Sequence, residues 1–359
     1  MAISRRAFLR SGASVAAAAA VPAMLTAAVP NTTSCRQRAL VVVELNGGND
    51  AINTVIPIAD PAYAHARPTL AVPRSRALML DPRTALHPAM RHMHRLYHTG
   101  RLAIIQGVGY PNPSRSHFRS QEIFHRGDLS PQLNTGWLGR LWQQTAAHIP
   151  DRAALVHCGS DMPEMFRAPL ASPLAMKFDE QDRLTHDPAG ASPIVQVSLA
   201  NTNAAYPPGR FGAGLAAFAQ IIARDARPMM FHISLGGFDT HAKQAQTHAA
   251  LLGALSSALA AFLDDLRSRG RDRDVMLVVF SEFGRRLKEN TSAGTDHGCA
   301  GVMFLAGGSV RGGLYGACPS LTDLADGDLK HTVDFRDCYA AAANWMVGAV
   351  QTRGSTQFA

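Results

Sequence analysis

The sequence lacks the short motifs that identify the commonest enzyme classes. It contains no phosphate-binding Gly-x-x-x-x-Gly-Lys loop, no Gly-x-Gly-x-x-Gly opening a helix, no Gly-x-Ser-x-Gly nucleophile elbow and no His-Glu-x-x-His pair. Interpretations as a nucleotide-binding protein or a simple serine esterase therefore lose their usual support.

Cysteine pairs and runs of basic residues are also missing. The five cysteines include no Cys-x-x-Cys; Cys299 and Cys318 are the nearest candidates for a disulfide, and an odd count leaves at least one thiol free. Lysine and arginine are scattered and not interleaved with aromatic residues, so no nucleic-acid-binding surface is predicted. The net charge of +8 falls to +5 without Arg5, Arg6 and Arg10. This modest basic excess suits an anionic small-molecule or polymer substrate.

The amino terminus carries an export signal. Residues 4–10 read Ser-Arg-Arg-Ala-Phe-Leu-Arg, and an alanine-rich, weakly apolar segment follows at 13–28. Residues 1–28 therefore predict a twin-arginine signal peptide, recognised by the twin-arginine translocase and cleaved near Ala27 or Ala28, with an uncleaved anchor as the alternative. A membrane span needs about 20 strongly apolar residues, so no stable transmembrane segment is expected. The predicted location is periplasmic or extracellular.

Apolar runs alternate with helical patterns along the rest of the chain. The runs predict strands at 40–45, 102–107, 154–157, 194–199, 229–235, 274–280 and 301–306. Helices are predicted at 242–269, at 86–98 and after Asp334. This alternation predicts one α/β domain over 36–352, with a doubly wound, mostly parallel sheet and helices on both faces. The proline-containing segment around 160–193 is expected to be an insertion or a lid.

Three of the predicted strands end in potential metal ligands. Asp50, Asp239 and Glu282 follow the runs at 40–45, 229–235 and 274–280, and His297 comes soon after Glu282. Ligands of open parallel sheets bind beyond the carboxyl ends of the strands. Each aspartate alone also fits an N-cap or turn role, but the whole set favours a functional site.

A serine-rich segment follows the strand at 102–107. Ser114 or Ser116 could present a nucleophile at a strand-to-helix turn, with Arg115 beside it as an anion clamp. A helix N-cap with a solvated Arg115 explains the same residues equally well. For His117 a packing or capping role is expected, because adjacent side chains rarely face each other.

Ten sequence blocks resemble the domain of unknown function 1501 family and cover nearly the whole chain after the signal. They are Gly-Gly-Asn-Asp at 47–50, Pro-Ala-Tyr at 61–63, Arg-Pro-x-Leu-Ala at 67–71, His-Pro-Ala-Met at 87–90, Ser-Arg-Ser-His-Phe at 114–118, Gly-Trp-Leu-Gly-Arg at 136–140, Gly-Phe-Asp-Thr-His at 237–241, Ser-Glu-Phe-Gly-Arg at 281–285, Thr-Asp-His-Gly at 295–298 and Asp-Phe-Arg at 334–336.

That family resembles in turn the alkaline phosphatase and sulfatase superfamily, which implies an alkaline-phosphatase-like fold and a site of one or two divalent metal ions, zinc or manganese. The resemblance implies a nucleophile at Ser114 or Ser116, anion-gripping arginines at Arg115 and Arg285, and the metal ligands Asp50, Asp239, His241, Glu282, Asp296 and His297.

Two departures from the superfamily pattern change what is expected. Phe283 stands where that pattern has a histidine, and phenylalanine cannot coordinate a metal, which argues against a full two-metal site. Pro111 stands where sulfatases place the residue that becomes formylglycine, which argues against sulfatase chemistry of that kind. The expected function is metal-assisted hydrolysis of a phosphate or sulfate ester. The alternative is a non-catalytic periplasmic binding or assembly protein on a degenerate scaffold.

Overall fold

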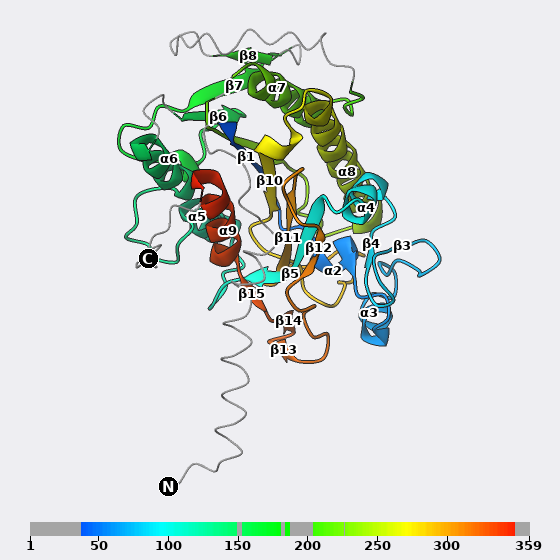
Figure 1. Cartoon of the computed structure of the whole chain (residues 1–359). Coiled ribbons are helices and arrows are strands. Elements are labelled where there is room, and N and C mark those ends of the chain that lie inside the picture. The colour runs from blue at the N-terminus through cyan, green and yellow to red at the C-terminus, as the bar shows by residue number, and fades with distance from the viewer. Residues whose placement is uncertain (1–36, 149–152, 181–183, 187–203, 226, 349–359) are drawn as a thin grey trace, which may run out of the picture.

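The computed structural model describes residues 37–148, 153–180, 184–186, 204–225 and 227–348, and its centre is one large mixed sheet (Figure 1). The strand order is β12-β5-β11-β10-β1-β9-β6-β7-β8, and β15 also pairs with β5. The strands are β1 (Ala39–Leu45), β5 (Leu102–Gly109), β6 (Ala154–Cys158), β7 (Leu174–Phe178), β8 (Leu184–His186), β9 (Met229–Leu235), β10 (Val275–Phe280), β11 (Gly301–Ala306), β12 (Gly313–Tyr315) and β15 (Val333–Asp334).

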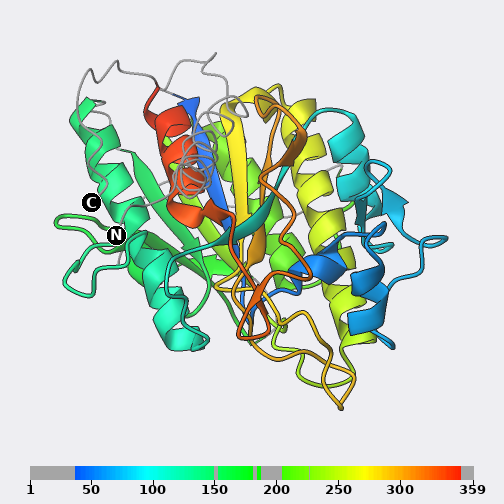
Figure 2. The same ribbon diagram turned by 90° about the horizontal axis from the view of Figure 1, so that it is seen from below.

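Helices cover both faces of this sheet (Figure 2). Alternate residues of β1 point to opposite faces: Val41 and Val43 pack with α4 (Arg91–His98), α7 (Arg210–Arg224) and α8 (Gln244–Ser268). Leu40 and Val42 pack with α5 (His117–Arg126), α6 (Trp137–His148) and α9 (Phe335–Val347). Burial on both faces explains the unbroken apolar strand sequences, and it confirms the predicted doubly wound α/β fold.

Short elements complete the structure around the main sheet. They are α2 (Ala51–Thr54), α3 (Pro61–Ala66), a small three-stranded sheet of β2 (Val55–Ile56), β4 (Ala85–Leu86) and β3 (Leu78–Met79), the 3₁₀ helices η2 (Glu164–Phe166) and η5 (Asp272–Asp274), and the hairpin of β13 (Leu324–Ala325) with β14 (Asp328–Leu329). Residues of α2, α3, β2 and β14 pack into a separate apolar cluster, which includes Ile52, Tyr63 and Leu329.

Most of the predicted elements are confirmed, with local corrections. The helix predicted at 86–98 begins only at Arg91, because Leu86 pairs with β2 and β3 instead. In the predicted insertion, β7 pairs in parallel with β6 as part of the main sheet, and the lid role of the segment stays a prediction. The strand predicted at 194–199 and the signal peptide at 1–28 lie outside the described residues.

The disulfide considered for Cys299 and Cys318 is wrong, because both thiols are free. Instead, the Cys299 thiol lies 3.2 Å from a carboxylate oxygen of Asp328.

Helix α8 is the one described helix long and apolar enough to cross a membrane. More than half of its most apolar window is buried inside the protein, and it packs against α4 and α7. This environment is that of a core helix, which accounts for its apolar composition.

The sheet topology brings several loops to one edge. Strands β9, β1 and β10 are parallel, and β5 runs in the same direction because β11 is antiparallel to both β10 and β5. The loops that follow β1, β5, β9 and β10 therefore emerge at the same edge as the segment that enters β11. Every predicted site residue lies on one of these segments.

Candidate metal centre

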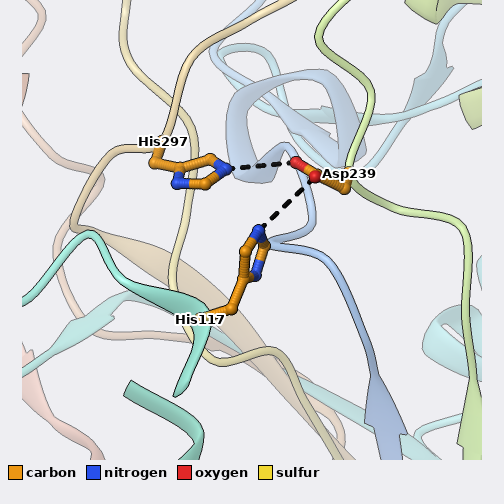
Figure 3. A group of neighbouring side chains, drawn as sticks. All are labelled: His117, Asp239 and His297. Atoms are coloured by element: carbon orange, nitrogen blue, oxygen red, sulfur yellow. Dashed lines mark hydrogen bonds and ion pairs between the residues drawn. The ribbon is translucent and has the colours of Figure 1, made fainter. Parts of the chain in front are cut away.

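Three side chains from separate segments converge at this edge: His117 at the start of α5, Asp239 after β9, and His297 before β11 (Figure 3). One ligand atom from each lies within 4.8 Å of the other two. Nε2 of His297 is 3.1 Å from Oδ1 of Asp239, and Nε2 of His117 is 3.5 Å from its Oδ2. Two imidazoles and one carboxylate are a common ligand set for zinc and other divalent transition metals.

The other ring nitrogen of His117 and of His297, Nδ1, makes a hydrogen bond to another residue of the protein. Nδ1 of His297 lies 2.7 Å from the carbonyl oxygen of Arg115, and a carbonyl can only accept, so Nδ1 carries the proton. Nδ1 of His117 lies 2.8 Å from Oε1 of Glu282, where it donates to the carboxylate oxygen. In the neutral rings, both Nε2 lone pairs then face Asp239. A divalent cation between the rings and the carboxylate would use these lone pairs as ligands.

The burial of His117 Nε2 also favours a bound cation. Its Nε2 atom is inaccessible to solvent and has no hydrogen-bond partner among the described residues. A buried nitrogen is rarely left without a partner, and a metal ion satisfies it without a proton. The donor set therefore fits a divalent cation.

Asp239 is the charged member of the group. Burial alone would raise its pKa, but the hydrogen bond and the charge of Arg285 lower the pKa of Asp239 to about 2. Asp239 is therefore a carboxylate at any physiological pH, as metal coordination requires.

Glu282 lies behind His117 and is fully buried. Its Oε1 atom accepts the Gly47 N–H at 2.8 Å as well as the His117 ring. This carboxylate–histidine pair fixes the ring orientation and increases the basicity of the free Nε2 atom. Glu282 contacts the metal group through His117 instead of joining it.

Arg285 makes hydrogen bonds to three of the loops that form the site. Its side chain is fully buried and donates to the carbonyl oxygens of Gly48 and Thr295 at 2.8 and 2.7 Å, and to Oδ1 of Asp239 at 2.6 Å. Further bonds reach the carbonyl oxygens of Gly47 and Phe238. In this position Arg285 orients Asp239 and closes the loops, and its guanidinium is not open to a substrate anion.

Close main-chain contact places His297 next to this loop. Arg285 and His297 form an isolated antiparallel bridge, and the Gly298 N–H donates to the Gly284 carbonyl oxygen at 2.9 Å. A Cβ atom on Gly298 would lie 2.5 Å from the carbonyl carbon of Arg285. The glycine that follows the histidine is therefore required for the two loops to approach.

Phe283 forms the apolar side of the site. It is buried, and its ring centre lies 4.9 Å from that of His117 and 4.7 Å from that of His297. Phe283, which argued in the sequence against a second metal ion, thus packs against both imidazoles of the candidate metal group.

His241 and Asp296 lie at the exposed rim. Nε2 of His241 is 3.0 Å from Oδ1 of Asp239 and 2.9 Å from Nε2 of His297, and its Nδ1 atom is 3.4 Å from Asp296. Both side chains are exposed to solvent.

Asp50 lies in a different, fully buried contact. Its carboxylate binds Arg67 through distances of 2.6 and 3.2 Å and accepts the Gln244 amide at 2.5 Å. Burial alone would raise the pKa of Asp50, but the charge of Arg67 lowers it overall. Asp50 is also the N-cap of α2. The structure does not bring it into the group of three, and its metal role stays a prediction.

The segment before α5 contacts the site through its main chain. Arg115 provides the carbonyl that orients His297, while its side chain binds Asp328 at 2.7 Å. The Ser114 hydroxyl accepts the Ser116 N–H, and Ser116 is the N-cap residue of α5 without a side-chain cap bond. Nucleophile and clamp roles for these residues stay predictions.

His117 is the member of this candidate metal group that sequence reasoning missed. It was expected to pack or cap because it follows Ser116 directly. The available signal was the position of a histidine at a helix start after a strand of the parallel sheet, at the same edge as Asp239 and Glu282.

The fold and the site together define an α/β protein with a two-histidine, one-carboxylate group at the carboxyl edge of its central sheet. Residues 196–346 match the family model described as "Protein of unknown function (DUF1501)", which confirms the resemblance seen in the sequence. No curated protein matches the sequence.

Several solved structures are similar in fold. The C-terminal periplasmic domain of EcEptC from Escherichia coli, in complex with Zn, has a TM-score of 0.46 and 10% identity, over 91% of this chain and 90% of that one. Ps i-CgsB has a TM-score of 0.46 and 11% identity, over 88% and 73%. The putative sulfatase yidJ from Bacteroides fragilis has a TM-score of 0.43 and 9% identity, over 86% and 74%. Likenesses this distant do not bear on the chemistry of the site.

Proposed function

We propose that this protein is an exported, metal-dependent hydrolase of anionic esters, and that His117, Asp239 and His297 hold one divalent cation, zinc or manganese. The observation that carries the proposal is the direction of the two imidazoles. Each uses Nδ1 to donate to the protein and turns Nε2 toward the same carboxylate.

The surrounding residues have separate tasks in this proposal. Glu282 orients His117, and Arg285 holds Asp239 ionised and in place. His241 lies at the exposed rim, within hydrogen-bonding distance of Asp239, where it can transfer a proton to or from a bound ester. A divalent cation bound there would supply Lewis-acid polarisation of the ester oxygen.

The proposal of an anionic ester rests on two features of the sequence. The motif order resembles the alkaline phosphatase and sulfatase superfamily, and the chain without its signal keeps a net charge of +5. Export rests on the twin-arginine pattern at 4–10. Replacing Arg5 and Arg6 by lysine is expected to leave the protein in the cytoplasm of a bacterial host, as measured by cell fractionation.

Metal analysis followed by activity measurement tests the site. Purified protein, dialysed against zinc or manganese, is expected to retain one ion per chain, and to hydrolyse p-nitrophenyl phosphate or p-nitrophenyl sulfate. His297→Ala and Asp239→Asn are expected to lose both the ion and the activity. Lys177→Ala, at an exposed position of β7, is the control and keeps both. Absence of a bound ion in the reconstituted wild-type protein would refute the proposed site.

A binding or assembly protein remains the second candidate. The side chains of both predicted anion clamps, Arg115 and Arg285, are engaged by Asp328 and Asp239. Phe283 also occupies the position of a second-site ligand. One tightly held ion without hydrolysis of either ester would favour this second function over the first.

A further inference from the structure

A second group of polar side chains lies inside the protein, apart from the metal site. Glu44 at the end of β1, His232 in β9 and His157 in β6 are each at least 97% buried. His125, in the last turn of α5, reaches the same place. These residues point into the apolar layer between the sheet and α5, α6 and α9, among neighbours such as Phe166.

Hydrogen bonds join the four side chains in a line. Nε2 of His125 lies 3.1 and 3.0 Å from the two oxygens of Glu44, and Nε2 of His232 lies 3.1 Å from one of them. Nδ1 of His232 is 3.0 Å from Nδ1 of His157. Because an ionised carboxylate only accepts, both Nε2 atoms donate to Glu44.

The buried carboxylate of Glu44 depends on a histidine of α5 for its electrostatic stabilisation. Burial alone would raise the pKa of Glu44, but His125 and His232 lower it to about 2. Burial alone would lower the pKa of His125, but Glu44 raises it overall, with smaller contributions from Glu164 and then Glu282. From α5, His125 thus provides a basic partner for a carboxylate in the middle of the core. Removing one partner of such a pair leaves the other charge buried and unpaired.

The same two elements meet again at the metal site. Helix α5 carries His125 in its last turn and the proposed ligand His117 at its first position. Strand β1 ends just beyond Glu44, and the Gly47 N–H three residues later donates to Glu282, the residue that orients His117. The Glu44–His125 pair and the Glu282–His117 pair therefore fix α5 to the end of β1 and β10 at both ends of the helix.

We propose that Glu44 is a positioning residue of the metal site, which sets the depth and rotation of α5 through His125 and so holds His117 against Asp239. This inference rests on the proposed function, since it requires that His117 binds the metal. It explains why an acid and three histidines occupy a place that the fold could fill with apolar side chains.

Cobalt binding tests this role, because the visible spectrum of Co²⁺ reports the geometry of its ligands. The full-length protein is titrated with CoCl₂, as wild type and as Glu44→Gln and His125→Gln. Both variants are expected to bind Co²⁺ about tenfold more weakly, as outer-shell changes commonly do, with a shifted visible band. A merely structural role would leave the band of the bound ion unchanged.

Asp265→Asn is the matched control. Asp265 is 3% exposed and accepts hydrogen bonds from Arg269 and Tyr206, but it lies on α8, on the opposite face of the sheet. Its replacement is expected to lower the melting temperature without changing Co²⁺ affinity or spectrum.

The outcomes separate this inference from the proposed function. If wild type binds Co²⁺ and both variants bind it with the same affinity and band, the positioning role is refuted while the metal site stands. If wild type binds no Co²⁺, the proposed function itself fails. If Glu44→Gln does not fold, His125→Gln, which keeps Glu44 hydrogen-bonded to His232, decides the question.

Discussion

Replacement of Asp50 by asparagine separates a structural role from the metal role that the sequence predicted for it. The substitution keeps the shape of the side chain and removes its charge. Arg67 is then left fully buried with its guanidinium facing neutral groups, where Asp50 had bound it at 2.6 Å. We expect a large loss of stability and no loss of metal.

The magnitude follows from the burial of both partners. Breaking a buried ion pair by removing one member costs about 3–5 kcal/mol. Unfolding entropy of about 2.1 cal/mol/K per residue, over the roughly 300 residues that the structure describes, amounts to about 0.6 kcal/mol/K. The melting temperature of Asp50→Asn is therefore expected to fall by about 5–8 °C.

The pH dependence has a definite sign. Because the pKa of Asp50 is lowered in the folded protein from its ordinary value of 3.8, the ion pair stabilises the fold above that value and is lost as the pH falls further. The difference in unfolding free energy between wild type and Asp50→Asn should be constant near pH 7 and should shrink below about pH 4.

Calorimetry and zinc titration together decide between the two roles. Arg67→Met combined with Asp50→Asn serves as the control, because removing both charges should cost less than the two single changes added together. If Asp50→Asn loses zinc while its melting temperature stays within 1–2 °C of wild type, about the effect of a neutral surface change, the structural assignment is wrong. Asp50 would then be a ligand, as the sequence resemblance implied.

Three further predictions concern the site and its support. Gly48→Ala would place a Cβ atom 2.2 Å from the Phe283 ring, at a backbone φ of +76° that alanine rarely adopts. It should destabilise the protein by about 1–3 kcal/mol and weaken zinc binding in a calorimetric titration. Unchanged zinc binding would contradict the packing role of Phe283. Burial lowers the pKa of His157 to about 4, so between pH 6.5 and pH 4.5 the unfolded chain binds a proton that the folded protein does not, and the free energy of unfolding should fall by about 2 kcal/mol over this range. Urea denaturation at several pH values should show a smaller fall for His157→Gln than for wild type. An equal fall in both proteins would exclude His157 as the source of the pH dependence. Arg285→Lys cannot replace the several bonds of a buried guanidinium, so zinc affinity should fall at least tenfold in competition with a chelator; wild-type affinity would show that Asp239 needs no such support.

The central strands and the longest helix were predictable because their signals are local. A strand buried on both faces must be apolar at every position, as Val275–Phe280 is, and a helix packed on one face must repeat its leucines at three- and four-residue spacing, as α8 does. Boundaries depended on partners elsewhere in the chain. Leu86 entered a strand because β2 and β3 were available to pair with it.

The candidate site was predictable as an edge of the sheet but not as a set of ligands. Asp239, Glu282 and His297 were expected together, because loops at the carboxyl ends of parallel strands must meet. Which of them faces a metal depends on side chains far away in sequence. Arg67 engages Asp50, Asp328 engages Arg115, and His117 comes between Glu282 and Asp239.

The amino-acid sequence alone determined the fold class, the family resemblance and the place where polar residues gather, because each follows from periodicity or from the order of motifs along one chain. Only the tertiary structure decided the roles of individual residues. A carboxylate bound by a buried arginine is held in a salt bridge, whereas one faced by two imidazole lone pairs can bind a cation. In the sequence, Asp50 and Asp239 are each an aspartate that follows a strand. Only their contacts with residues far away in the chain distinguish them.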